Sequence, residues 1–169
     1  MRFDYYARLS ARGQATYRAS DAVATLAIPG ADSLRGDVTR LAQCLAAADR
    51  AGLEAAANRL ASGITRALEV AAVRVEVLAV RPTLRWGELH GLYTDEAPQP
   101  RIKLWMRTAR HRRPVAFRTF LRTLLHEVLH HLDYTHLKLA DSLHTEGFFK
   151  RESSLFRQLV PEDSRHTRP

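Results

Sequence analysis

The stretch Leu124–Phe149, LLHEVLHHLDYTHLKLADSLHTEGFF, decides both the fold and the site. Its first part contains His126-Glu127-x-x-His130 within an apolar run. In a helix, residues four positions apart lie about 6 Å apart along the axis and roughly 40° apart around it. Both imidazoles would therefore point to one side and could fill two corners of a zinc tetrahedron. Glu127 would then lie beside the open corner, where it can act as a general base.

The third ligand has several candidates: His136, Asp141, His144, Glu146 and Glu152. His136 has the metzincin spacing, but Asp133 replaces the turn glycine and both methionines precede the motif. Glu152 stands on a predicted helix, as a glutamate ligand does in thermolysin-like enzymes, but Phe156 stands where a further acidic residue is expected. His144 has the best context, because HTEGF places a phenylalanine four residues after it at the start of a helix.

The length and composition predict one folded domain. The chain has 169 residues, of which 46% are apolar, enough to bury a core. Its one cysteine, Cys44, excludes an internal disulfide and a cysteine zinc ribbon, and fits a reducing compartment. The longest apolar run, 22–28, is too short to span a membrane, and no signal-peptide pattern is seen. We therefore expect a cytoplasmic protein without a membrane partner, of undetermined oligomeric state.

Hydrophobic periodicity predicts an α+β fold. Helical spacing covers 10–27, 34–48 and 53–68, and period-two alternation from 72 to 82 indicates a strand. Two more strands are expected at 87–96 and 101–109, then a long helix through the motif with Pro114 near its first turn, and a final helix over 147–159. This gives a helical N-terminal region at 1–71, a core at 72–160 with a small sheet and the motif helix, and a tail at 161–169.

The net charge of +8 is concentrated in one place. The basic stretch Arg101–Arg122 contains no aspartate or glutamate. Such a one-signed stretch would attract phosphates or acidic polypeptides, so a nucleic-acid partner is one expectation. The alternative is a solvated arginine face without a partner.

The order of three strands, LLHEVLHH and then HTEGFF before a terminal helix resembles SprT-like zinc metallopeptidases and their minimal zincin relatives. The resemblance covers about Val73 to Leu159. It implies a zincin-like core and one zinc ion per chain, bound by His126, His130 and His144, with Glu127 as general base. It also implies that the strand near Arg101–Thr108 borders the cleft, where a polypeptide substrate could add as another strand. The zinc ribbon often found in bacterial members of this family is absent from the sequence.

We therefore predict a zinc metallopeptidase of the His-Glu-x-x-His type. The alternative is a nucleic-acid or protein-binding module with a structural or vestigial zinc site; a third reading is a metallohydrolase of a non-peptide amide. His131 is expected to face away from the metal, and His90 and His111 to lie on the surface. Further candidates are Asp133 or Asp141 to orient a ligand, and Tyr93, Tyr134 or Arg151 to stabilise an oxyanion.

Overall fold

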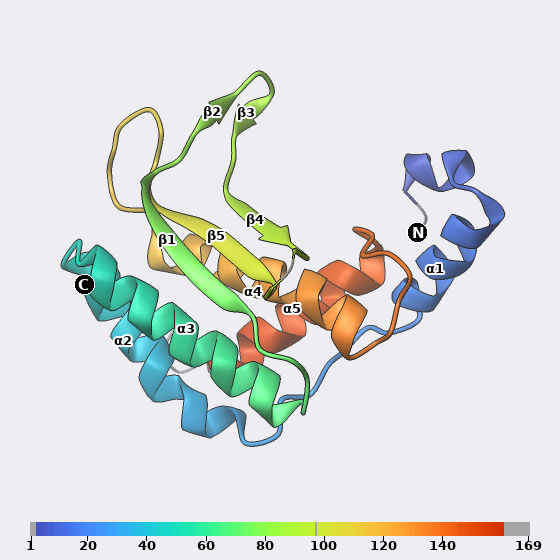
Figure 1. The fold of residues 1–169 in the computed structure, drawn as a ribbon, viewed down its shortest axis with the longest axis horizontal. Helices are drawn as coiled ribbons and strands as arrows, with labels where there is room; N and C mark the ends of the chain where they lie inside the picture. The colour runs from blue at the N-terminus through green and yellow to red at the C-terminus, as the bar shows by residue number, and fades with distance from the viewer. Residues whose placement is uncertain (1–2, 97, 161–169) are drawn as a thin grey trace.

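The structure is a computed structural model that describes residues 3–96 and 98–160, so the predicted tail at 161–169 lies outside the described residues. Within these ranges the chain has an α+β fold, in which a helical N-terminal region precedes a small mixed sheet and two further helices (Figure 1). The predicted fold class is confirmed at this level. Among the described residues, no helix is both long and apolar enough to cross a bilayer.

The N-terminal region consists of five helical elements. In chain order they are η1 (Asp4–Arg8), α1 (Ala11–Asp21), η2 (Ala31–Leu34), α2 (Arg35–Ala46) and α3 (Arg50–Ala67). Ser10 caps α1 by accepting a hydrogen bond from the backbone N–H of Gly13 at 3.1 Å. Helices α2 and α3 follow the apolar spacing of the sequence and bury Leu41, Leu53 and Leu60 completely.

Helix α1 ends at Asp21, so the predicted continuation to Ala27 is wrong. The carbonyl oxygens of Val23 and Leu26 accept hydrogen bonds from side chains of the last helix, from Arg151 at 2.7 Å and Gln158 at 2.8 Å. These backbone groups are therefore satisfied by tertiary contacts rather than by a further helical turn.

The sheet has the order β1-β5-β4. Its strands are β1 (Arg74–Val80), β4 (Gly91–Thr94) and β5 (Arg101–Arg107), and β2 (Thr83–Leu84) and β3 (Gly87–Glu88) form a separate hairpin. Strand β5 pairs in parallel with β1 and antiparallel with β4. The expectation that the strand near Arg101–Thr108 borders the cleft is therefore wrong, because β5 is the central strand and β4 is an edge. The apolar β5, with Ile102 and Leu104 buried, takes the centre, and the short, half-exposed β4 takes the edge.

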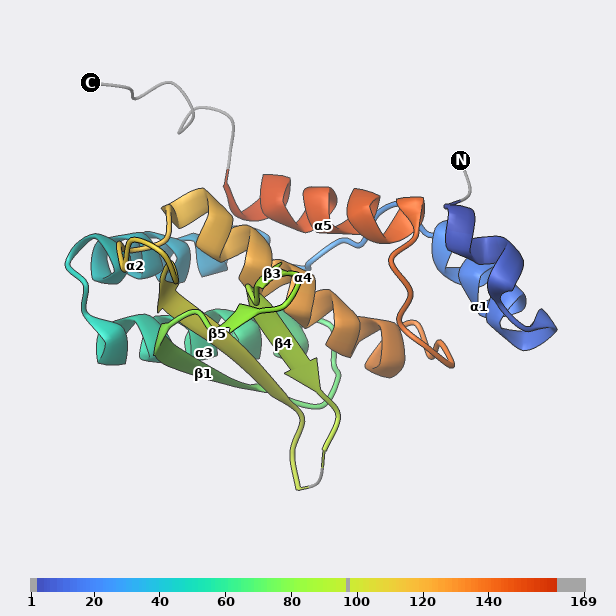
Figure 2. The ribbon, with the colours of Figure 1, turned by 90° about the horizontal axis from the view of Figure 1, so that it is seen from above.

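Helix α3 packs against β1, and α4 (Phe117–Thr135) packs against β4 and β5. Helix α4 lies between the sheet and α5 (Glu146–Leu159) (Figure 2). Pro114 precedes α4 and pairs with Arg107 in an isolated bridge, so the helix begins three residues later than the position of Pro114 suggested. A single cluster of buried apolar side chains joins α2 and α3 to the sheet and to α4 and α5. The N-terminal region therefore belongs to the same core as the motif helix.

Candidate metal centre

Three imidazoles meet at the surface of α4. His126 and His130 stand one turn apart on α4, and His144 comes from the loop before α5. The Nε2 atom of His144 lies 3.0 Å from Nε2 of His126 and 3.1 Å from Nε2 of His130. A tetrahedral zinc ion with bonds of 2.0–2.1 Å would separate its nitrogen ligands by roughly 3.3 Å. The structure thus brings the three predicted ligands together at a spacing close to that of a metal site.

The outward nitrogen of His126 is held by a carboxylate. Its Nδ1 lies 3.1 Å from Oε2 of Glu152, and Oε1 of the same carboxylate is 3.4 Å from the guanidinium of Arg122. A carboxylate only accepts, so Nδ1 of His126 carries the proton and Nε2 presents a lone pair. Glu152, a candidate third ligand by sequence, therefore stands behind the predicted ligand His126, in the position that acceptors of metal-bound histidines usually take.

The outward nitrogen of His130 is held by a longer chain of contacts. Its Nδ1 lies 2.7 Å from Oγ of Ser142, which in turn donates to Asp133 at 2.8 Å. Asp133 also accepts from Arg151 at 2.9 Å. Asp133 thus contacts the predicted ligand His130 indirectly, through Ser142, which agrees with one of the two sequence alternatives for an orienting residue. Ser142 was not predicted, because a serine two residues before a histidine carries no recognisable signal.

The electrostatics of the cluster favour a bound cation. Burial, together with the neighbouring His126 and His144, lowers the pKa of His130 to about 3. Burial also lowers the pKa of His144. Uncharged imidazoles therefore direct nitrogen lone pairs toward one point, where they repel one another unless a proton or a metal ion lies between them. The donor set of three neutral imidazoles fits zinc.

Glu127 lies beside this cluster under the edge strand. Its side chain is buried, with 7% exposure, and burial raises its pKa to about 7 against the lowering effects of His126 and of the backbone N–H of Tyr93. The approach to β4 is close, since a Cβ at Gly91 would come within 2.5 Å of Oε1 of Glu127. A side chain at that position of the strand would therefore displace Glu127 and Thr123.

An open groove runs between β4 and α4 over these groups. One hollow in it is lined by Glu88, His90 and Arg122, and the next by Tyr93, Tyr134 and His144, and both share Gly91, His126 and Glu127. The groove therefore follows the edge strand, with Glu127 and His126 in its middle.

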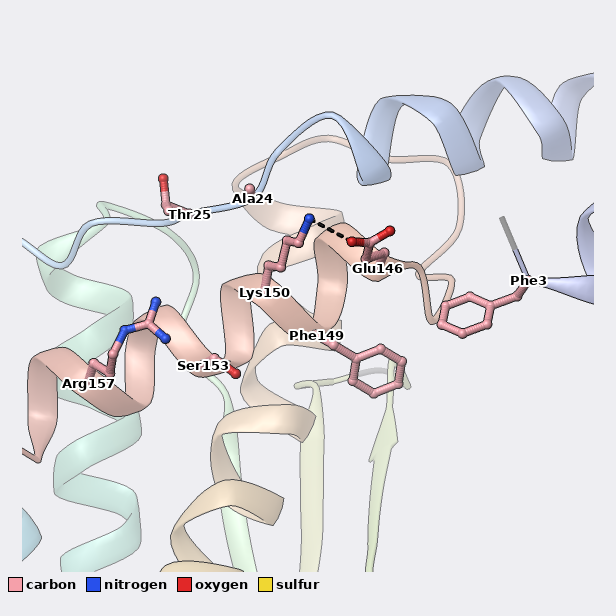
Figure 3. A pocket seen from close by; sticks show the side chains of 8 residues that line it. All are labelled: Phe3, Ala24, Thr25, Glu146, Phe149, Lys150, Ser153 and Arg157. Atoms are coloured by element: carbon pink, nitrogen blue, oxygen red, sulfur yellow. Dashed lines mark ion pairs between the residues drawn. The ribbon is translucent and has the colours of Figure 1, made fainter. Parts of the chain in front are cut away.

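The other candidate ligands lie elsewhere. His136 is exposed beyond the end of α4, and Asp141 accepts a hydrogen bond from Tyr134 at 3.2 Å. Glu146 lines a different pocket, with Phe3, Phe149 and Arg157 among its walls, and it pairs there with Lys150 at 2.7 Å (Figure 3). His144 alone of the five later candidates joins the motif histidines in the described cluster.

The predicted oxyanion donors are engaged in other contacts. Arg151 is fully buried against Asp133, so its proposed role toward an oxyanion is wrong. Tyr134 donates to Asp141, and the hydroxyl of Tyr93 lies 3.2 Å from Nδ1 of His131.

His131 faces away from the cluster, as expected. Its Nε2 lies 2.7 Å from the carbonyl oxygen of Ala71, so its Nδ1 accepts from Tyr93. This buried imidazole thus links α4 to the edge strand. His90 and His111 are exposed, which confirms their predicted surface location.

Comparisons with known proteins gave no assignment: no protein-family model, no curated protein and no solved structure matches the chain.

Proposed function

We propose that the chain is a zinc-dependent metallopeptidase. The observation that carries this proposal is the convergence of Nε2 atoms from His126, His130 and His144 beside the buried carboxylate of Glu127. One zinc ion per chain would be held by the three imidazoles. The chemistry that a bound zinc ion supplies is Lewis acidity toward water and toward a carbonyl oxygen.

Glu127 has the position and the basicity for the proton transfers. With a pKa near 7 in the metal-free site, the carboxylate can take a proton from water and later give it up. In peptide hydrolysis the water oxygen bonds to the carbonyl carbon, and Glu127 takes the released proton. It then passes this proton to the amide nitrogen as the carbon–nitrogen bond breaks.

The open edge of β4 supports a polypeptide as the substrate. Strand β4 has one hydrogen-bonded neighbour, β5, and its other side borders the groove that contains His126 and Glu127. An extended peptide can bind such an edge through main-chain hydrogen bonds, which places its amides along the groove. This favours peptide bonds over the non-peptide amides of the third reading. A zincin-like core, kinship with SprT-like metallopeptidases and a cytoplasmic location are further parts of this proposal.

The proposal is tested by metal content and cleavage together. Untagged protein should contain close to one zinc ion per chain and should cleave an unfolded polypeptide. A chelator should abolish cleavage, and added zinc should restore it. Protein that neither contains nor takes up zinc would refute the metal centre, and zinc-loaded protein that cleaves no unfolded polypeptide would refute the peptidase.

A second candidate function is nucleic-acid binding at one end of the groove. The structure divides the predicted basic stretch: Arg122 stacks on Phe156 with its guanidinium carbon 4.3 Å from the ring centroid, whereas Arg110, Arg112 and Arg113 are exposed on one loop. This loop lies close to the β2–β3 hairpin, since the pKa of Glu88, which burial would raise, is lowered by the nearby backbone at 109 and 110 and by Arg81.

The hairpin exposes an aromatic ring next to these charges. Trp86, at its tip, is 83% exposed, and the guanidinium carbon of Arg85 lies 5.6 Å from its ring. Exposed aromatic rings beside arginines suit single-stranded nucleic acid, whose bases stack on such rings. This exposed ring beside the arginines is the specific observation that favours the binding-module alternative. Nucleic-acid binding could accompany peptide hydrolysis at the metal centre or replace it.

This second candidate is tested by salt dependence. Replacing Arg110, Arg112 and Arg113 with glutamine should weaken binding of a single-stranded oligonucleotide and reduce the slope of log affinity against log salt by about 2. Replacing Arg8, Arg12 and Arg40, which are exposed elsewhere, removes the same charge and should change the slope less. Equal effects of the two triple variants would show that the loop is only a solvated face.

A further inference from the structure

A fully buried ion pair stands behind the metal centre. The side chains of Arg151 and Asp133 both have 0% exposure, and Nη2 lies 2.9 Å from Oδ1. Such a pair contributes little net stability compared with apolar residues of the same size, because both charges lose their hydration. Its location suggests another role. The other carboxylate oxygen, Oδ2, accepts from Ser142, which contacts the ring of His130.

The direction of these hydrogen bonds depends on the charge of Asp133. The hydroxyl of Ser142 has one hydrogen. Beside an ionised Asp133 this hydrogen points to Oδ2, so Oγ must accept from Nδ1–H of His130, and Nε2 keeps its lone pair. A neutral Asp133 would instead donate a hydrogen bond to Oγ of Ser142, and the hydroxyl of Ser142 would then donate its hydrogen bond to Nδ1 of His130. Nε2 would carry the ring proton and could not bind a metal.

Arg151 selects the first arrangement. Burial raises the pKa of Asp133, but the guanidinium of Arg151, a permanent cation without acceptor capacity, and the hydrogen bond from Ser142 act in the other direction and favour the carboxylate form. The N-terminal region takes other donors of the Arg151 side chain: Nη1 donates to the carbonyl oxygens of Ser20 at 2.6 Å and Val23 at 2.7 Å, whereas the buried Nε has no partner among the described residues. Nη2 also lies 3.0 Å from the hydroxyl of Ser20. The end of α1 thereby fixes the orientation of the guanidinium.

We propose that Arg151, Asp133 and Ser142 are positioning residues that hold His130 in the Nδ1–H tautomer, with the end of α1 completing their hydrogen-bond network. The N-terminal region is therefore part of the metal centre and not only a scaffold. This inference rests on the metal binding of the proposed function, but it does not require peptide hydrolysis.

The test combines ring tautomers with zinc affinity. In zinc-free protein, nitrogen NMR of the histidine rings should show His130 protonated on Nδ1, and Ser142→Ala should give a mixture of tautomers. The zinc affinity of Ser142→Ala, measured by competition with a chromophoric chelator, should fall about 10- to 100-fold. Ser142→Thr keeps the hydroxyl and should restore most of this loss. Ser153→Ala removes the same atoms from a pocket on α5 and should leave tautomer and affinity unchanged (Figure 3).

Arg151→Met examines the start of the network. In folded protein it should move the proton of His130 to Nε2 and weaken zinc binding. If this variant does not fold, the Ser142 variants still decide. The inference is overturned if parent His130 carries its proton on Nε2, or if Ser142→Ala binds zinc as tightly as the parent. A parent that binds zinc but cleaves nothing would refute the hydrolysis and leave the positioning network in place. The tautomer measurement uses zinc-free protein, so its result does not depend on whether the protein binds zinc.

Discussion

The two candidate ligands on α4 are each backed by a carboxylate and an arginine, directly at His126 and through a serine at His130, but the two arrangements differ in burial. Behind His126 stand the carboxylate of Glu152 and then Arg122, whose side chains are 13% and 43% exposed. Behind His130 stand Ser142, Asp133 and then Arg151, and the last two have 0% exposure. Both arrangements end in a cation that favours a carboxylate, and both direct Nε2 toward the same point. Only the arrangement behind His130 is also part of the core. Substitutions there should therefore change folding stability, whereas substitutions behind His126 should change mainly zinc affinity.

The largest effect on zinc binding is expected from removal of the third predicted ligand, His144, and the effects of the groups behind His126 and His130 can be compared with it. His144→Ala removes a ligand, so the protein should lose zinc after dialysis and should melt at the same temperature with and without chelator. His136→Ala changes an exposed histidine outside the cluster and should retain zinc. Zinc content after dialysis and thermal melting are the measurements. Zinc loss in His136→Ala together with retention in His144→Ala would show that the ligand assignment is wrong.

The next effect concerns folding stability and separates the two supports. Asp133→Asn leaves Arg151 buried without its counter-charge and should lower the free energy of unfolding by about 3–5 kcal/mol. Glu152→Gln is the matched change on the solvent side, and should lower it by less than about 1 kcal/mol. Urea denaturation of the zinc-free proteins measures both. Equal losses would contradict the contrast between the fully buried Asp133 and the partly exposed Glu152.

The smallest expected effect is the change in zinc affinity when the carboxylate behind His126 loses its charge. Glu152→Gln retains a hydrogen-bond acceptor for Nδ1 of His126 but removes its charge, so zinc affinity should fall by about tenfold, the lower end for outer partners of metal ligands. Chelator competition provides the measurement. Arg157→Gln, which removes a charge from an exposed position on the same helix, is the control. An affinity unchanged from the parent would mean that Glu152 does not orient His126.

The parts of the site that the sequence predicted are those that depend on local geometry. His126, Glu127 and His130 fall on one side of α4 because the helical period fixes their relative directions. The context of His144, two residues before α5, placed it near them. Asp133 could be named as an orienting residue, but its link to His130 through Ser142 joins residues nine positions apart in the chain, and only the folded loop brings them together.

The parts that sequence reasoning missed depend on distant contacts. The end of α1 is set by hydrogen bonds from Arg151 and Gln158, more than a hundred residues away. The central place of β5 depends on which strands pair, and alternation within one strand does not reveal this. Arg151 looked like a surface cation available to a substrate, yet its partner Asp133 comes from a different helix and encloses it in the core.

The central claim, that Glu127 acts as a general base beside a zinc ion, is tested most directly by comparing Glu127→Gln with the parent. The amide has the same size but cannot accept and return a proton, while the three imidazoles still bind the metal. We predict about one zinc per chain in both proteins and at least a 100-fold slower cleavage of an unfolded polypeptide by the variant. Zinc analysis and cleavage should be measured on the same preparations. A zinc-loaded Glu127→Gln protein that cleaves as fast as the parent would contradict the claim.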